Sequence, residues 1–310
     1  MRSDLIRLSG QALVLAFLTA ILAVFVAHIA VLAPLEGTAE RVGLLLLGLI
    51  AAALFALLIY KAYRGDVGAL LQRFNTQLGR FFFWLMVLVA LFEFLSIQSV
   101  ETIWGREVYP RLSDVFGREF WFEDKKGFRA LLLHGGSALL ALVLTILTRG
   151  VKLIWFALIL VLVQFLIVVF RFVFEINAIS AQQIVRWFHV GIFLVGAALT
   201  LREDGHVRVD IFYQNLTARG KARVNAIGGM LFLMPFCLLI LADATFGATS
   251  AALYQDWRTV KGAVEETGFK AIYILRSLPV VFAVMLLIEG AALVCKDMET
   301  ATRRVEKEPS

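Results

Sequence analysis

Cysteine, proline and charged side chains are all scarce in this 310-residue chain. Its 2 cysteines are too few for a disulfide framework or a four-ligand zinc site, and both lie inside apolar runs. With 5 prolines and 23 glycines that follow no three-residue period, collagen and proline-rich disorder are excluded. Only 17% of the residues are charged, whereas 60% are hydrophobic. A water-soluble domain could not bury that much apolar surface, so we expect an integral membrane protein.

Motifs of soluble enzymes are also missing. The sequence contains no glycine-rich phosphate loop, no Walker lysine, no HExxH pair and no nucleophile beside a base. We therefore expect no enzymatic activity, and no metal or cofactor bound by this chain. The net charge of +6 does not indicate nucleic-acid binding, because Lys and Arg fall almost entirely between apolar runs, where they act as topology signals.

Eight apolar runs are long enough to cross a bilayer, at 11–34, 42–63, 80–98, 130–148, 152–174, 185–201, 224–247 and 271–295. They predict an all-α, integral membrane bundle of about eight transmembrane helices, surrounded by membrane lipid. The first run is longer than the apolar part of a signal peptide and no clear cleavage site follows, so we expect it to be retained. Lys and Arg divide 17 against 12 between alternate connections, which predicts that both termini are cytoplasmic.

The eight runs form two blocks of four with similar spacing. A shift of 141 residues places Gly127-Phe128-Arg129-Ala130 on Gly268-Phe269-Lys270-Ala271. Two interpretations stay open, namely a divergent parallel repeat and an unrelated N-terminal four-helix extension. In either case we expect a first membrane block at 1–150, a second at 151–297 and a cytoplasmic tail at 298–310.

A charged segment that composition does not explain follows the sixth run. It reads GAALTLREDGHVRVDIFY, from Gly196 to Tyr213. Val207, Val209 and Ile211 alternate with charged residues, and two aromatic residues follow. This pattern favours a short amphipathic element at the cytoplasmic membrane interface.

The segment resembles the small, Q-type membrane subunit of tripartite ATP-independent periplasmic (TRAP) transporters. That family has a Gly-Ala-Ala run followed by Leu-Arg-x-x-Gly-His-[Val/Ile]-Arg-Val-Asp. The aromatic and arginine residues of 170–174 and the Leu-Arg-Ser-Leu-Pro run of 275–279 are similar to the ends of other helices in the family. The resemblance covers roughly 150–297. Ala181, Gln182 and Gln183 depart from it, because the family usually has Trp and an acidic residue there.

The resemblance implies a subunit that scaffolds the large, M-type permease subunit in the bacterial inner membrane. A periplasmic substrate-binding protein would deliver an organic acid, and sodium ions bound by the large subunit would drive import. The transported substrate is not encoded in this chain. The residues implied at the partner interface or in the motif are Arg171, Arg202, Gly205, His206, Arg208 and Asp210.

Three ionisable residues inside the runs are expected to brace the bundle, since charge at membrane depth is costly. Asp243 and Arg276 lie at similar depth on neighbouring helices and are expected to pair, with partner contact and an ion pathway as the alternatives. Glu289 is expected to meet Arg202, His206 or Arg208.

A second function stays open at this point. His28, His134 and His189 all fall in the outer part of their spans, a placement that suits axial ligands of haem b. The alternative is therefore a membrane electron-transfer subunit, or a stand-alone membrane scaffold.

Overall fold

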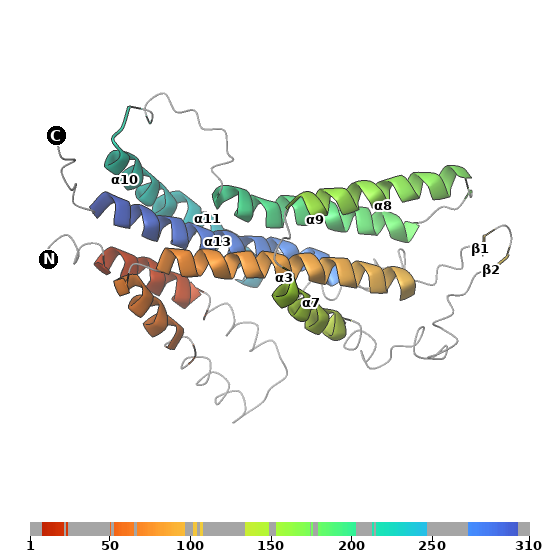
Figure 1. Cartoon of the computed structure of the whole chain (residues 1–310), viewed down its shortest axis with the longest axis horizontal. Coiled ribbons are helices and arrows are strands. Elements are labelled where there is room, and N and C mark those ends of the chain that lie inside the picture. Colours follow the sequence, from red (N-terminus) through yellow and green to blue (C-terminus); the bar gives the residue numbers. More distant parts are fainter. Residues whose placement is uncertain are drawn as a thin grey trace. The chain divides into compact units, whose positions relative to one another are not determined.

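The computed structural model describes residues 8–21, 23, 50, 53–64, 67–96, 102–103, 106–107, 134–148, 153–173, 175, 179–202, 213, 215–246 and 272–302. Nearly all of them are helical (Figure 1). The helices are Leu8–Ile21, 53–64, α3 (Val67–Ser96), α7 (Gly136–Leu147), α8 (Leu153–Val173), α9 (Ile179–Arg202), α10 (Ala218–Gly228), η2 (Gly229–Leu233), α11 (Met234–Phe246) and α13 (Ile272–Thr302). The two-residue strands β1 (Thr102–Ile103) and β2 (Arg106–Glu107) pair antiparallel.

The all-α membrane fold predicted from the sequence is confirmed. Each of the eight apolar runs contains helix, and four described helices are long and apolar enough to cross a bilayer, at Val67–Phe92, Ile154–Val173, Ala218–Asp243 and Leu278–Thr302. Shorter apolar helices lie at Leu8–Ile21, Gly136–Leu147 and Ile184–Phe193. The chain is therefore a multi-pass membrane protein.

Two helices extend well past the apolar runs that predicted them. Helix α3 begins at Val67, 13 residues before the run at 80–98, and α13 continues to Thr302, past the end of the run at 295. Hydropathy marks only the apolar part of a helix, whereas the backbone hydrogen bonds of a helix can continue into polar residues. The polar beginning of α3 has such partners, as described below.

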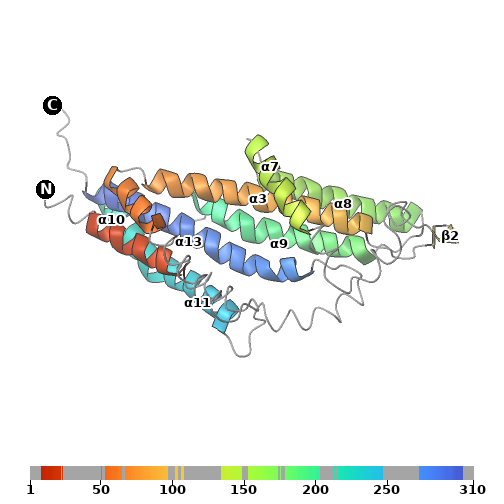
Figure 2. The ribbon, with the colours of Figure 1, turned by 90° about the horizontal axis from the view of Figure 1, so that it is seen from below.

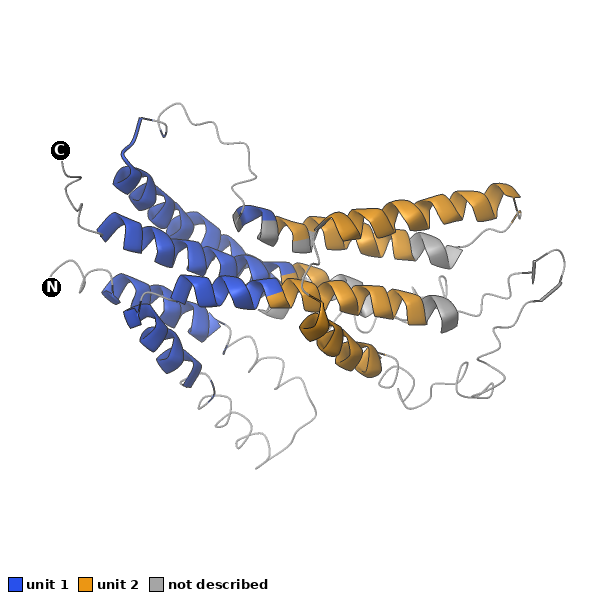
Figure 3. Ribbon diagram, in the orientation of Figure 1, with its two compact units in different colours: residues 1–76, 198–250, 282–310 blue, residues 77–197, 251–281 orange. Residues whose placement is uncertain are grey.

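Two compact units divide the chain (Figure 3). Unit 1 contains residues 1–76, 198–250 and 282–310, and unit 2 contains residues 77–197 and 251–281. Each unit takes segments from both sides of residue 150. The two consecutive four-helix blocks expected from the sequence, at 1–150 and 151–297, stay a prediction, as does the 141-residue repeat.

The core of unit 1 is the part of α13 that follows Phe282. Leu287, Ala291 and Cys295 are fully buried on it. Figures 1 and 2 show α13 beside the α10–α11 helix and the N-terminal helix. Glycines permit close approach, since a Cβ at Gly68 would lie 3.3 Å from the carbonyl oxygen of Ala292.

The helix from α10 to α11 contains one wide turn, the π-helical segment η2. The backbone N–H of Met234 donates to the carbonyl of Gly229, five residues back. Pro235 follows at once, and its ring would crowd the carbonyl four residues earlier in a regular α-helix. The wide turn accommodates this proline, so the span continues without a break.

Unit 2 is held by aromatic contacts between α3, α8 and α9. The rings of Phe83 and Phe156 meet edge to face with centroids 4.7 Å apart. The fully buried indole of Trp187 donates to the carbonyl of Met86 over 3.2 Å. Gly191 lies against the Met86 side chain, where a Cβ would be 2.5 Å from Cε.

Neighbouring glycines in unit 1 provide a test of this packing. A Cβ at Gly229 would lie 2.5 Å from Cγ2 of the stiff, buried Val294, whereas a Cβ at Gly228 meets no atom within 4 Å. Gly229→Ala is expected to lower the free energy of unfolding by about 1–3 kcal/mol through overpacking. Gly228→Ala is the matched control and should be neutral or stabilising, because alanine favours helix by about 1 kcal/mol. Thermal unfolding of both variants is measured in detergent. Equal midpoint temperatures would contradict the close packing of Gly229 against Val294.

Candidate functional site

A carboxylate lies in the apolar core of unit 1. Glu289 on α13 is fully buried, and its neighbours Leu286, Leu287, Ile288 and Ala292 are buried as well. It stands 13 residues before the end of α13 at Thr302, about 20 Å along the helix. A carboxylate at such a depth needs hydrogen-bond donors, because its desolvation is costly.

Helix α3 supplies two of these donors from one face. Gln72 Nε2 donates to Glu289 Oε1 over 3.2 Å, and Asn75 Nδ2 donates to Oε2 over 2.8 Å. Gln72 and Asn75 are three residues apart, which puts their side chains on the same side of the helix. Each carboxylate oxygen therefore receives one amide donor.

A third amide reaches α13 from the N-terminal helix. Gln11 is fully buried, and its Nε2 donates to the carbonyl of Cys295 over 3.0 Å and to Glu299 Oε1 over 3.2 Å. Gly10 beside it lies against Met298. Segments before residue 77 thus bind α13 with side-chain hydrogen bonds at two levels.

Sequence reasoning identified Glu289 as a bracing residue but missed these amide donors. Gln72 and Asn75 fall between two apolar runs, in a stretch interpreted as a connection, and Gln11 opens the first run. The available signal was the recurrence of amides at i and i+3 in LLQRFNTQLG, the spacing of one helix face. The expected partners of Glu289 were Arg202, His206 or Arg208, and their side chains lie outside the described residues.

The charged motif itself is described only at its two edges. Arg202 is the last residue of α9, while Gly205, His206, Arg208 and Asp210 lie outside the described residues. Just beyond them, the hydroxyl of Tyr213 donates to Asn225 Oδ1 over 3.1 Å. Lys221 Nζ lies 5.3 Å from the centre of the Tyr213 ring. The end of the motif is thereby attached to α10.

The other predicted charged residues are placed as follows. Arg171 is exposed in the last turn of α8, and Asp243 is exposed on α11. Arg276 is on α13, but its side chain is outside the described part of the structure. The Asp243–Arg276 pair stays a prediction.

The histidines behind the haem alternative are only partly described. His189 is exposed on α9, with its ring Nδ1 3.2 Å from the carbonyl of Val185. His134 is half-buried just before α7, and His28 lies outside the described residues. Within the described part of the chain, no three His, Cys, Asp or Glu side chains gather where they would hold a metal ion.

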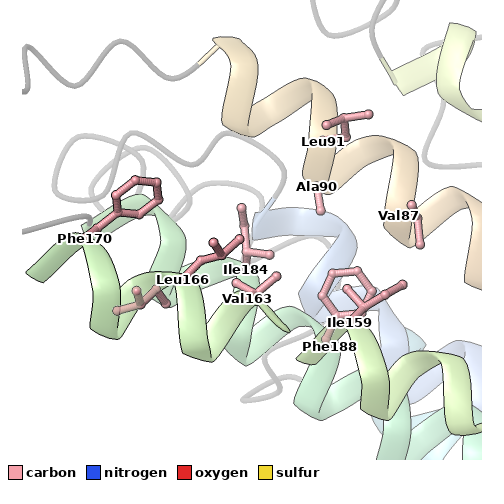
Figure 4. Close-up of a pocket in the computed structure, with 10 residues that line it drawn as sticks. Val87, Ala90, Leu91, Ile159, Val163, Leu166, Phe170, Ile184 and Phe188 are labelled. Carbon is pink, nitrogen blue, oxygen red and sulfur yellow. The ribbon is translucent and has the colours of Figure 1, made fainter. Parts of the chain in front are cut away.

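Unit 2 contains an apolar pocket of about 270 Å³. Figure 4 shows its side chains, which come from α3, α8 and α9 and include Ala90, Val163 and Phe188. Its lining is entirely aliphatic and aromatic, so it offers a ligand neither charge nor hydrogen bonds. This pocket has no chemistry beyond contact with another apolar group.

The comparison with protein families assigns the second half of the chain. Residues 160–297 match the model of the DctQ component of tripartite ATP-independent periplasmic transporters. Over this part, the chain is similar to the DctQ family. The DctQ region begins inside α8 and ends inside α13, so it contains the charged motif and Glu289. The family resemblance drawn from the sequence is confirmed, and DctQ proteins are transporter components rather than enzymes.

Comparisons with curated proteins and with solved structures find no match. Residues 1–159 lie outside the DctQ match. They include Gln11, Gln72 and Asn75, so the donors to α13 come from the part of the chain that the family model does not cover.

Substitutions at Asn75 test the polar contact. Asn75→Leu removes the 2.8 Å donor to Glu289, and we expect the free energy of unfolding to fall by about 2–3 kcal/mol. Asn75→Asp places a second carboxylate against the first, and we expect a larger loss of about 3–5 kcal/mol. Gln77→Leu, at an exposed position on the same helix, is the control. The free energy of unfolding in detergent is measured for all three variants. An Asn75→Leu protein as stable as the Gln77→Leu control would contradict the hydrogen bond to Glu289.

Proposed function

We propose that this chain is the small membrane subunit of a TRAP-type secondary transporter and scaffolds the large permease subunit. The transporter would take an organic acid from a periplasmic binding protein and import it across the bacterial inner membrane, driven by a sodium gradient. The DctQ match over residues 160–297 carries this proposal. The sodium ions would bind to the large subunit.

The exposed surface of α8 supports a scaffold role. Among its described side chains only Phe156 is buried, whereas Phe165 and Phe172 are 62% and 76% exposed. Apolar helix surface in a membrane is covered either by lipid or by another subunit. Arg171 ends this surface and would contact the partner or the lipid headgroups.

The N-terminal segments would strengthen the scaffold from inside. Their amides hold α13 by hydrogen bonds, and its side chains from Ala283 to Cys295 are mostly buried. With α13 covered by its own chain, the surfaces left for a large permease subunit are on other helices. Among the four described candidate spans, the one on α8 has the smallest buried share. The chain would thus widen the membrane-embedded body of the transporter without supplying a transport site.

A charge reversal in the motif tests the assembly. Arg208→Glu is expected to reduce co-purification of the large subunit about tenfold or more, because a cation at the interface becomes an anion. Arg73→Glu reverses an exposed cation on α3, outside the DctQ region, and is the control. Pull-down from membranes containing both subunits and the binding protein measures the ratio. Equal recovery from both variants would exclude the motif from the interface.

Uptake assays test the energy source and the substrate class. Vesicles containing the complete transporter and its binding protein are expected to accumulate one member of a panel of labelled carboxylic acids when an inward sodium gradient is imposed. Accumulation should stop when potassium replaces sodium or when a sodium ionophore removes the gradient. Accumulation that depends instead on ATP would overturn the secondary-transport proposal.

A further inference from the structure

Unit 1 contains a second, larger pocket of about 890 Å³. Its walls come from the end of α9, from α10, η2 and α11, and from α13. The volume lies within the range of about 300–1,000 Å³ that is typical of small-molecule sites. Nothing described so far uses this space.

Three glycines and the π-helical turn line the pocket. Gly228, Gly229 and Gly290 all line it, and a Cβ at Gly228 would meet no atom within 4 Å. The space beside Gly228 is therefore open, whereas Gly229 and Gly290 pack tightly against Val294 and Leu233. The wide turn of η2 lies along the same wall.

The lining is apolar at one end and polar at the other, unlike that of the pocket in unit 2. Phe232 and Phe236 belong to the apolar part and are 75% and 50% exposed. Asn225, Lys296 and Asp297 form the polar part, beside the start of the apolar run at 224–247 and the end of the run at 271–295. A ligand that fits both parts is an amphiphile lying along the helices, with its polar group at the membrane surface.

Charge selects the kind of amphiphile. Lys221 lies one helical turn before Asn225, on the same face of α10. Its Nζ is beside the ring of Tyr213, whose hydroxyl donates to Asn225. Lys296 lines the polar end and Lys221 lies beside it, whereas Asp297 is the one carboxylate among the described lining residues. Basic pockets between transmembrane helices characteristically bind anionic lipid headgroups.

We propose that this pocket binds an anionic phospholipid. One acyl chain would lie against Phe232, Phe236 and Gly228, and the phosphate would contact Lys296 and Lys221. The proposal requires only that the chain is in a membrane, and it does not depend on the transporter assignment.

Filling the pocket tests the acyl-chain part of the proposal. The full chain is purified in detergent, incubated with phosphatidylglycerol or phosphatidylcholine, and its retained lipid is counted by mass spectrometry. The wild type is expected to retain phosphatidylglycerol at least fivefold better, and Gly228→Leu should abolish this preference by occupying the open space. Gly136→Leu is the control, because Gly136 on α7 also has no atom within 4 Å of a built Cβ and lies outside the pocket.

Removing a cation tests the headgroup part without filling the core. Lys296→Gln is expected to lower phosphatidylglycerol retention about fivefold, the effect of one basic residue near an anionic surface. Arg73→Gln removes an exposed cation elsewhere in unit 1 and should leave retention unchanged. Equal retention of both lipids by the wild type would overturn the proposal. So would an unchanged preference for phosphatidylglycerol in Gly228→Leu, since the lipid would then not occupy the space beside Gly228.

Discussion

The burial of one carboxylate governs how unit 1 is built. Glu289 lies among apolar side chains at a depth where no bulk water is available, so its oxygens must receive hydrogen bonds from the protein. Gln72 and Asn75 donate those bonds, and they are correctly spaced only if α3 is already helical well before its apolar run begins. One buried group on the last helix therefore accounts for the unexpected length of a helix that lies more than 200 residues earlier.

This contact also joins the segments before residue 77 to the part of the DctQ region that lies in unit 1. The family model begins at residue 160, but Gln11, Gln72 and Asn75 all belong to the compact unit that contains the end of α13. Amide side chains suit this task, because they satisfy a carboxylate without bringing a second net charge into the membrane. Apolar side chains at the same positions would leave Glu289 without these donors.

Much of the fold was accessible from the sequence, because long apolar runs correspond to helices in a membrane protein. The family was also accessible, since the run from Gly196 to Asp210 is local and specific. The side-chain contacts between distant helices were not accessible from the sequence. The bracing role of Glu289 was predicted from the free-energy cost of a charge at membrane depth. Its donors, however, lie in a polar stretch that hydropathy classifies as a connection. Periodicity gives the face of a helix, whereas it does not say which distant helix that face will meet. The ends of α3 and α13 were misjudged for the same reason.

The sequence separation of these contacts has a consequence for biogenesis. Gln11 and Cys295 are 284 positions apart, and Asn75 and Glu289 are 214 apart. Helix α13 follows the other described helices along the chain, so the amides of the earlier helices are synthesised before their acceptors exist. Until α13 is synthesised, the hydrogen bonds of Gln11, Gln72 and Asn75 to this helix cannot form. Arrival of α13 then closes loops of 214 to 284 positions, an entropic cost that the packing of this helix must offset.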